Sequence, residues 1–189
     1  MSLPTAYRLL HQNASRQLST WTAPDQAQER LRTGYLSHLA AHPDAMWKRG
    51  PSAHFTASCL VLDPTGSRAL LTLHKKAGVW FQLGGHFEPR DTDAHSAAQR
   101  EAREESGIPT LVARAELVQL DRHHLVGSFG RCREHLDLRF LAVADTSAEL
   151  AVSRESLDVR WWPTDALPEE TRDELEPLVA CARAMLGLP

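Results

Sequence analysis

The sequence has little cysteine and no long hydrophobic run. Its 189 residues include three cysteines, Cys59, Cys132 and Cys181, which are odd in number, far apart and outside any Cys-x-x-Cys pair. This usage argues against a disulfide framework and indicates reduced thiols. No apolar run reaches the length of a membrane span, and the N-terminus lacks the basic start and apolar core of a signal peptide. We therefore expect a cytoplasmic protein without a membrane partner.

Positive charge is also not in excess. The sequence has 21 lysines and arginines against 24 aspartates and glutamates, which gives a formal net charge of -3 at pH 7. Proteins that bind duplex nucleic acid usually carry a basic patch, so we expect no duplex nucleic acid as a partner. The hydrophobic content of 42% is ordinary for a globular protein, there are no internal repeats, and the length suits one domain with an extension.

Residues 1–50 predict helices but not an independent domain, because their apolar residues are too few to form a separate core. The stronger helix is expected from Pro24 to Ala41, with Thr22 as a possible N-cap and apolar residues at every fourth position. We interpret 1–50 as an N-terminal helical extension of a domain that spans 51–189. The apolar stripe of this extension can pack against the main sheet, form the contacts of a homodimer or cover the substrate as a lid.

From residue 54 the pattern changes to β-strands. Residues 54–63 and 68–76 are rich in apolar and β-branched residues and flank the turn Pro64-Thr65-Gly66, which predicts a hairpin. Four further segments predict strands: 79–83, 111–124, 135–144 and 156–163. An amphipathic helix is expected from Pro168 to Leu186. Together with a helix between the two groups of strands, this order predicts an α+β fold with a mixed sheet packed between helices.

The most informative stretch runs from Gly84 to Ile108. Its glycine pair and an acidic loop precede a predicted helix that ends at Gly107, a residue type that commonly terminates helices. Candidate N-caps are Asp91, Thr92 and Asp93. At about 100° per residue, three glutamates share one side of this helix with three alanines. These six residues are Ala94, Ala97, Ala98, Glu101, Glu104 and Glu105.

Glutamates on a helix commonly form a solvated face with ion pairs one turn apart. Here the small alanine side chains let the helix approach other backbone closely, which draws the glutamates toward the interior. Several ionised carboxylates in that place would repel each other and lose their hydration. A divalent cation removes this conflict, and Mg²⁺ combines a few carboxylate oxygens with waters and with phosphate oxygens of a substrate.

The same stretch resembles the signature of the Nudix hydrolases, the superfamily that includes MutT-like proteins. That signature is a Gly, five residues, a Glu, seven residues, Arg-Glu, an apolar residue, any residue, Glu-Glu, any residue, a Gly and an apolar residue. The sequence has Gly85, five residues, Asp91, eight residues and then REAREESGI from Arg100 to Ile108. An aspartate thus replaces the first glutamate and one residue is inserted, which leaves the role of Asp91 open.

The resemblance implies a three-layer α/β/α sandwich. It also implies hydrolysis of a pyrophosphate bond in a nucleoside diphosphate derivative or a related organic pyrophosphate, so the partner is a small nucleotide or pyrophosphate substrate. Mg²⁺ or Mn²⁺ is the implied cofactor. The similarity extends to about residues 54 to 168, because the strand pair before the signature and the closing stretch SRESLDVRWWPTDALP look like those of the family. The signature does not specify which pyrophosphate is cleaved.

The family's metal ligands carry over to the helix glutamates and to the backbone carbonyl of Gly84 or Gly85. Glu104 and Glu105 are expected to bind the metal directly. Glu101 is expected either to share a metal or to take the proton from the attacking water.

Two further residues belong to this predicted catalytic group. Arg100 resembles the family's arginine that orients the carboxylates by charge-assisted hydrogen bonds. Glu155 matches an acidic residue that some members supply as a metal ligand from a later loop, although a glutamate there is also common in a solvated turn. Lys75 and Lys76 can contact phosphate from a strand end or belong to a solvated turn.

Two other functions stay open beside a hydrolase, and a zinc site is a weaker candidate. A ligand-sensing module would keep the fold and lose the chemistry. A prenyl-diphosphate isomerase of the same fold calls for a catalytic cysteine in an Asn-Cys-Cys-type loop, whereas the equivalent loop here reads QLGGH and Cys59 lies upstream in a strand. A zinc site would use His123, His124 and His135, but no regular ligand spacing links them and the first two point to opposite faces of a strand.

Overall fold

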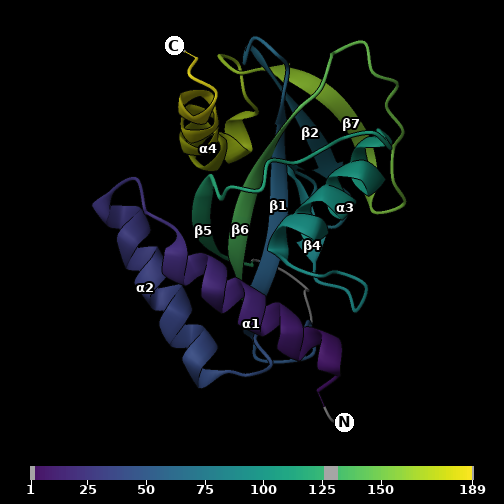
Figure 1. The fold of residues 1–189 in the computed structure, drawn as a ribbon. Coiled ribbons are helices and arrows are strands. Elements are labelled where there is room, and N and C mark those ends of the chain that lie inside the picture. The colour runs from purple at the N-terminus through teal and green to yellow at the C-terminus, as the bar shows by residue number, and fades with distance from the viewer. Residues whose placement is uncertain (1–2, 126–131, 189) are drawn as a thin grey trace.

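The computed structural model describes residues 3–125 and 132–188 (Figure 1). The described helices are α1 (Thr5–Thr20), α2 (Gln26–Ala41), α3 (Ala94–Ser106), the short 3-10 helix η1 (Glu169–Thr171) and α4 (Arg172–Met185). The described strands are β1 (Ala53–Leu62), β2 (Arg68–His74), β3 (Trp80–Phe81), β4 (Leu83–His86), β5 (Gln119–His124), β6 (Glu134–Val143) and β7 (Ser156–Pro163). None of these helices is long and apolar enough to cross a membrane.

The strands form one mixed sheet around β1. The main path of the sheet has the order β3-β2-β1-β6-β5, and β7 pairs with β2. β1 runs parallel to β6 from Ala53 to Leu62. Along its other edge, β1 pairs antiparallel with β4 between Thr56 and Cys59 and with β2 at Val61 and Leu62. The partner of β1 therefore changes midway along this edge, and β4 lies beside β1 but off the main path.

Alternation along the strands separates two apolar cores, as expected for a sheet covered on both faces. Phe55 and Ala57 of β1 belong to a core shared with α1, α2 and α3, whereas Leu60 and Leu62 belong to a second core shared with α4. Figure 1 shows α4 at the upper end of the strands and the α1 and α2 pair at the lower end. The arrangement confirms the predicted α+β sandwich with a mixed sheet between helices.

Helices α1 and α2 contribute large side chains to the first of these cores. The buried side chains from the two helices are Tyr7, Leu10, Ala14, Leu18, Tyr35 and Leu39. Two hydrogen bonds also tie α1 to the loop before α3. The Tyr7 hydroxyl donates to the Phe87 carbonyl at 3.3 Å, and the Asn13 amide donates to the Thr92 carbonyl at 2.6 Å. The first helix therefore supports the segment that leads into the signature helix.

Three local expectations were wrong. The N-cap of α2 is Asp25 rather than Thr22, because the Asp25 carboxylate accepts a hydrogen bond of 2.8 Å from the Gln28 N–H. The segment 79–83 is divided between β3 and β4, which pair with different strands, and Gly84 and Gly85 lie inside β4 rather than in a loop.

The third wrong expectation is the strand predicted over 111–118. This segment pairs with β6 at a single isolated bridge, Ala113 to Ala142, instead of forming a regular strand. Side chains of α3 take part of the hydrogen bonding in this region, because Arg103 Nε donates to the Leu111 carbonyl at 2.7 Å and the Gln99 side chain accepts from the Ala113 N–H at 3.1 Å. The indole N–H of Trp21, the C-cap of α1, donates to the Leu117 carbonyl at 3.0 Å.

Candidate functional site

Helix α3 is fixed at both ends by its own flanking residues. At its start, the Asp93 carboxylate accepts a hydrogen bond from the Ser96 N–H at 2.7 Å and the Ser96 hydroxyl accepts one from the Asp93 N–H at 3.1 Å. At its end, Gly107 has a φ of 76°, a left-handed conformation that favours glycine. A Cβ on Gly107 would also lie 2.5 Å from Ala151. These contacts fix which side of α3 faces the sheet.

Two of the three signature glutamates meet the glycine pair of β4. The Glu105 side chain is buried and accepts a hydrogen bond of 2.8 Å from the Gly84 N–H. A Cβ on Gly85 would lie 2.6 Å from a carboxylate oxygen of Glu101. Gly84 therefore supplies a donor, and Gly85 supplies the space that Glu101 occupies.

Arg100 links the loop before α3 to the carboxylates on the helix. Its guanidinium donates to both oxygens of Asp91, at 2.8 and 3.0 Å, and to Glu101 at 2.8 Å. It also donates to the His86 carbonyl at 3.0 Å. The Asp91 side chain is 3% exposed and the Arg100 side chain 12% exposed, so most of this ion pair is removed from water. Asp91 thus orients Arg100, and the inserted residue before Arg100 does not prevent their pairing.

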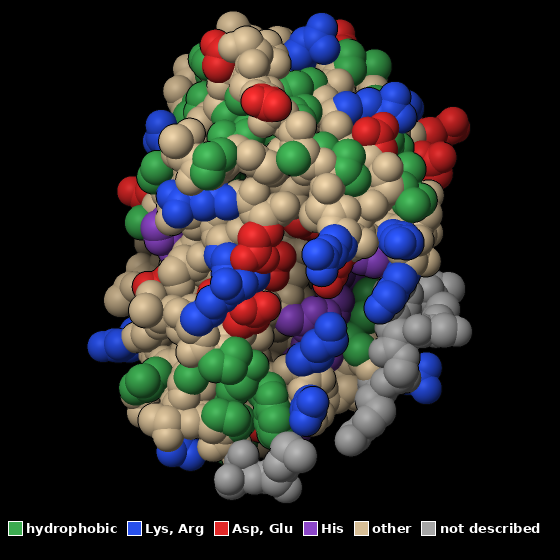
Figure 2. Space-filling model, turned by 90° about the vertical axis from the view of Figure 1, so that its right-hand side faces the viewer, with side chains coloured by type: hydrophobic (Ala, Val, Ile, Leu, Met, Phe, Trp, Pro, Cys, Tyr) green, Lys and Arg blue, Asp and Glu red, His purple; other side chains and the backbone are tan. Residues whose placement is uncertain are grey.

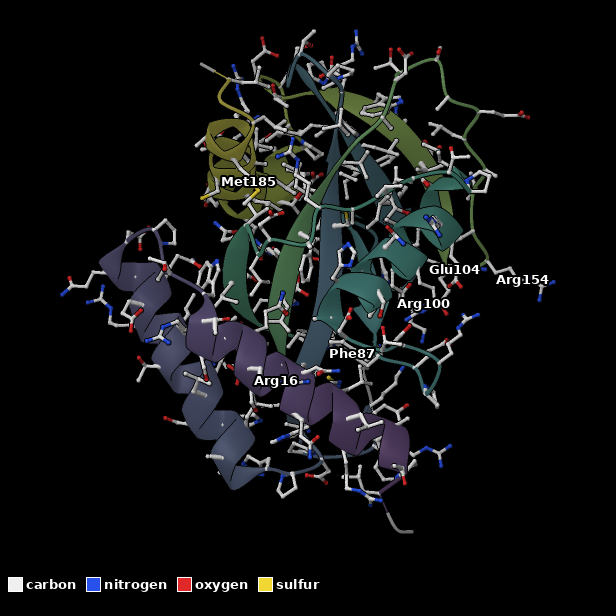
Figure 3. All side chains as sticks on the ribbon, viewed as in Figure 1. Arg16, Phe87, Arg100, Glu104, Arg154 and Met185 are labelled. Carbon is white, nitrogen blue, oxygen red and sulfur yellow. The ribbon has the colours of Figure 1, made fainter. Side chains whose placement is uncertain are left out.

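Glu104 and Glu155 lie at the exposed side of the cluster. The Glu104 carboxylate is half exposed and accepts hydrogen bonds from Arg90 at 2.7 Å and from Arg100 at 3.3 Å. Figure 3 shows Arg100 and Glu104 projecting from the same side of α3. Glu155 is exposed just before β7, and its charge raises the pKa of both Glu101 and Glu105. The fold thus brings the predicted acidic residues into one region.

The cluster holds more negative charge than its arginines balance. Burial raises the pKa of Glu101 and raises the pKa of Glu105 to about 8. Neighbouring carboxylates add to both shifts, whereas Arg100 opposes the shift of Glu101 and the Gly84 N–H opposes that of Glu105. A cation beside these groups would relieve both their repulsion and their lost hydration. Because the donors are all oxygens, the residues fit Mg²⁺ or Mn²⁺.

Trp80, an aromatic residue of the type that can stack on a nucleotide base, and Lys76 have different surroundings. Trp80 is buried, packs against Trp162 with ring centroids 5.3 Å apart and lies under the Arg160 guanidinium at 4.4 Å. It is therefore a core residue and not a free platform for a base. Lys76 lies in the turn after β2, and its charge lowers the pKa of His86, the residue after the glycine pair of β4.

The histidines group differently from the set considered in the sequence. His135 lies beside His54 and His86, with ring centroids 5.4 and 5.1 Å away. No regular spacing along the sequence predicts this group. The three histidines are brought together only by the pairing of β1 with β4 and with β6. The only signal in the sequence was strand alternation, which puts His54 and His135 on defined faces of their strands.

The comparisons with known proteins agree with this geometry. The NUDIX domain matches residues 53–181. None of the curated proteins matches the chain. Among solved structures, a C. elegans Ap4A hydrolase binary complex is 19% identical, with a TM-score of 0.54 over 70% of this chain and 97% of that chain.

Two further solved structures show a similar fold. A MutT protein from Methanosarcina mazei Go1 is 20% identical, with a TM-score of 0.53 over 69% of this chain and 94% of that chain. A MutT NUDIX hydrolase from Burkholderia pseudomallei is 25% identical, with a TM-score of 0.50 over 66% of this chain and 96% of that chain. Since the domain match covers more than half of the sequence, the chain belongs to the NUDIX domain family.

Proposed function

We propose that this Nudix pyrophosphohydrolase depends on Mg²⁺ or Mn²⁺ and cleaves a pyrophosphate bond in a nucleoside diphosphate derivative or a related organic pyrophosphate. The proposed cation ligands are carboxylates of Glu101, Glu104, Glu105 and Glu155 together with the backbone carbonyl of Gly84 or Gly85. The observation that carries the proposal is the meeting of Glu101 and Glu105 of α3 with the glycine pair of β4.

The chemistry of the donors supports this choice of cation. Carboxylate and carbonyl oxygens are the ligands that Mg²⁺ and Mn²⁺ prefer, and a Mg²⁺ site commonly keeps positions for water and for phosphate oxygens of a substrate. Glu104 and Glu155 are exposed enough to meet a substrate, while Glu105 is held from behind by the Gly84 N–H. The proposed ligands thus include one buried carboxylate that is held in place, Glu105, and two that a substrate can reach, Glu104 and Glu155.

In the proposed reaction, a bond forms between a water oxygen and phosphorus, and the bond from phosphorus to a bridging oxygen breaks. The bound cation supplies neutralisation of phosphate charge and alignment of the attacking and leaving oxygens. Glu101 is suited to accept the proton of the attacking water, because Arg100 fixes its carboxylate at 2.8 Å and Asp91 in turn fixes Arg100. Arg100 therefore acts as a positioning residue.

The charges around the cluster support a substrate with several phosphate charges. Figure 2 shows lysine and arginine side chains gathered around acidic and histidine side chains on this face. Arg90 and Arg100 contact the carboxylates directly, and Lys48 and Lys76 lie near His86, the next residue of β4 after the glycine pair. Positive charges that surround a site attract polyanionic substrates.

The two alternatives of the same fold receive less support. An isomerase that uses a cysteine needs a reactive thiolate, whereas Cys59 is fully buried and burial raises the pKa of its thiol. A sensing module is compatible with the fold but would not need three carboxylates and an orienting arginine at one place. Turnover separates a sensing module from an enzyme.

The test is a panel of nucleotide sugars, ADP-ribose, dinucleoside polyphosphates and oxidised nucleotides, with phosphate release measured with and without an added phosphatase. We expect hydrolysis to vanish in EDTA and to return with Mg²⁺ or Mn²⁺. Glu101→Gln, Glu104→Gln and Glu105→Gln should each lower turnover by roughly two or more orders of magnitude. The thermal midpoint of the metal-free variants should stay the same or rise, since each change removes repulsion among the carboxylates.

The matched control is Glu116→Gln, the same chemical change at an exposed residue outside the cluster. Arg103→Gln is a poorer control, because Arg103 Nε donates to the Leu111 carbonyl at 2.7 Å and so holds the segment after α3. Full activity in EDTA would contradict the metal. Glutamine variants that stay active but melt earlier would show that the glutamates form structural ion pairs instead.

A further inference from the structure

A second group of metal-ligating side chains lies next to the carboxylates. It consists of His54 on β1, His86 on β4, His135 on β6 and Cys132 just before β6. The group is on the opposite face of β4 from Glu101, because Glu101 lies where a Cβ of Gly85 would point and the next residue of a strand points the other way. One ligand atom from each of the four residues lies within 4.8 Å of all the others.

Strand pairing holds three of these side chains in place. His54 and His135 are direct partners in the parallel pairing of β1 and β6. His86 pairs with Thr56, two residues along β1 from His54 and on the same face. The backbone beside Cys132 is also fixed, because the Arg133 N–H donates to the Ser52 carbonyl at 2.8 Å. The group is thus built on rigid elements.

The shortest distances match those between the ligands of one tetrahedral ion. Nε2 of His54 is 3.0 Å from Nε2 of His86 and 3.4 Å from Sγ of Cys132. Zinc bonds of about 2.0 Å to nitrogen and about 2.3 Å to sulfur place neighbouring ligand atoms about 3.3 to 3.6 Å apart in a tetrahedron.

The surroundings leave nitrogen lone pairs for a metal. Nδ1 of His54 lies 3.1 Å from the Pro51 carbonyl, so Nδ1 carries the hydrogen and Nε2 offers its lone pair to the group, as in many metal-binding histidines. Nε2 of His135 is buried and has no hydrogen-bond partner among the described residues.

We propose that His54, His86, His135 and Cys132 bind one transition-metal ion, with Zn²⁺ as the best match. Three imidazoles and one thiolate favour zinc, whereas Mg²⁺ favours the oxygens on the other face of β4. The ion fastens β4 to β1 and β6 and thereby fixes the strand that carries Gly84 and Gly85. The site does not depend on the proposed hydrolase function, since its ligands are separate from the glutamates.

The test measures metal binding by the full chain without any assay of turnover. We expect one equivalent of zinc per chain by elemental analysis after incubation with Zn²⁺ and removal of unbound metal. With Co²⁺ in place of Zn²⁺, we expect the visible bands of tetrahedral cobalt and a sulfur-to-cobalt charge-transfer band. Cys132→Ser should abolish the charge-transfer band, and His135→Gln should lower the bound zinc at least tenfold at limiting metal.

Cys181→Ser is the matched control, because Cys181 is another partly buried free thiol and lies outside the group. This variant should keep both the zinc and the charge-transfer band. A wild-type chain that binds no zinc, or a cobalt spectrum without a sulfur band, overturns the proposal, and neither result depends on the folding of a variant. A sulfur band that persists in Cys132→Ser also overturns it. Loss of EDTA-sensitive hydrolysis in the glutamate variants tests the proposed hydrolase function and does not test the zinc site.

Discussion

Asp91 is the residue whose role the structure changes most, because it orients Arg100 by a buried two-pronged ion pair. Asp91→Asn keeps the shape of the side chain but removes its charge. Breaking a buried pair on one side costs about 3 to 5 kcal/mol, and the loss of an orienting group commonly lowers activity by about 10- to 100-fold. We expect both effects, measured by chemical denaturation and by turnover at saturating Mg²⁺.

Asp93→Asn is the control for this change. It makes the same substitution two residues later, at the N-cap of α3, where asparagine caps a helix about as well as aspartate. Wild-type stability and turnover in Asp91→Asn would mean that the ion pair does not position Arg100.

Residue identity and spacing in the sequence were sufficient to predict only part of the candidate site. The three glutamates of α3 could be predicted because helical periodicity and the Nudix resemblance specify them together. The pairing of Asp91 with Arg100 could not, because it depends on how the loop absorbs one inserted residue. The group formed by His54, His86 and His135 could not, because it depends on which strands are neighbours in the sheet.

Among the elements, the contact of α2 with β5 is the clearest case of a helix that completes a sheet edge. β5 is the last strand of the main path, so among residues 3–125 and 132–188 no strand lies beside its outer edge. The Gln28 amide donates to the Leu120 carbonyl at 3.0 Å, and the Leu120 N–H donates to the Gln28 side chain at 2.7 Å. One side chain thus satisfies both backbone groups of an edge residue.

Gln28→Ala should therefore lower the free energy of unfolding by about 2 kcal/mol or more, because a buried backbone donor and a buried acceptor lose their partners. Gln26→Ala, at an exposed position of the same helix, is the control and should leave it unchanged. The measurement is urea unfolding followed by circular dichroism. Equal midpoints for the two variants would show that water replaces the Gln28 amide at no cost.

Periodicity predicted most of the elements well, including the strand 156–163, which matches β7 at both ends. The errors came where other parts of the chain take over backbone hydrogen bonds. In the segment 111–118, the Trp21 indole bonds Leu117, and Arg103 and Gln99 of α3 bond Leu111 and Ala113, so no local pattern in this segment predicts its hydrogen-bond partners. The division of 79–83 between β3 and β4 could not be predicted for a similar reason, because β3 pairs with β2 and β4 pairs with β1.

For the whole molecule, the N-terminal helices and the sheet share one core, although the NUDIX domain match begins at residue 53. Removing residues 1–50 would take away Tyr35, whose ring packs 5.2 Å from that of Phe55, and the other α1 and α2 side chains of this core, so their partners would be exposed to water. Each fully exposed large apolar side chain costs about 1.5 to 3 kcal/mol, and several are exposed at once. We therefore expect the fragment 51–189 to aggregate or to unfold without a cooperative transition.

Thermal unfolding by circular dichroism and size-exclusion chromatography check this prediction. Removal of residues 1–4, which precede α1, is the control and should leave the transition as sharp as in the full chain. A monomeric fragment 51–189 with the same thermal midpoint as the full chain would show that α1 and α2 are dispensable for folding.

The long separation between α1 and its partners also sets the timing of folding during synthesis. Tyr7 reaches Phe87 across 80 residues, and Trp21 reaches Leu117 across 96 residues. A ribosome that adds about 5 to 20 residues per second needs roughly 5 to 20 seconds to make a stretch of that length. Until that stretch has been made, the apolar stripe of the two helices has no partner to cover it, because α3 and the strands that complete the shared core do not yet exist.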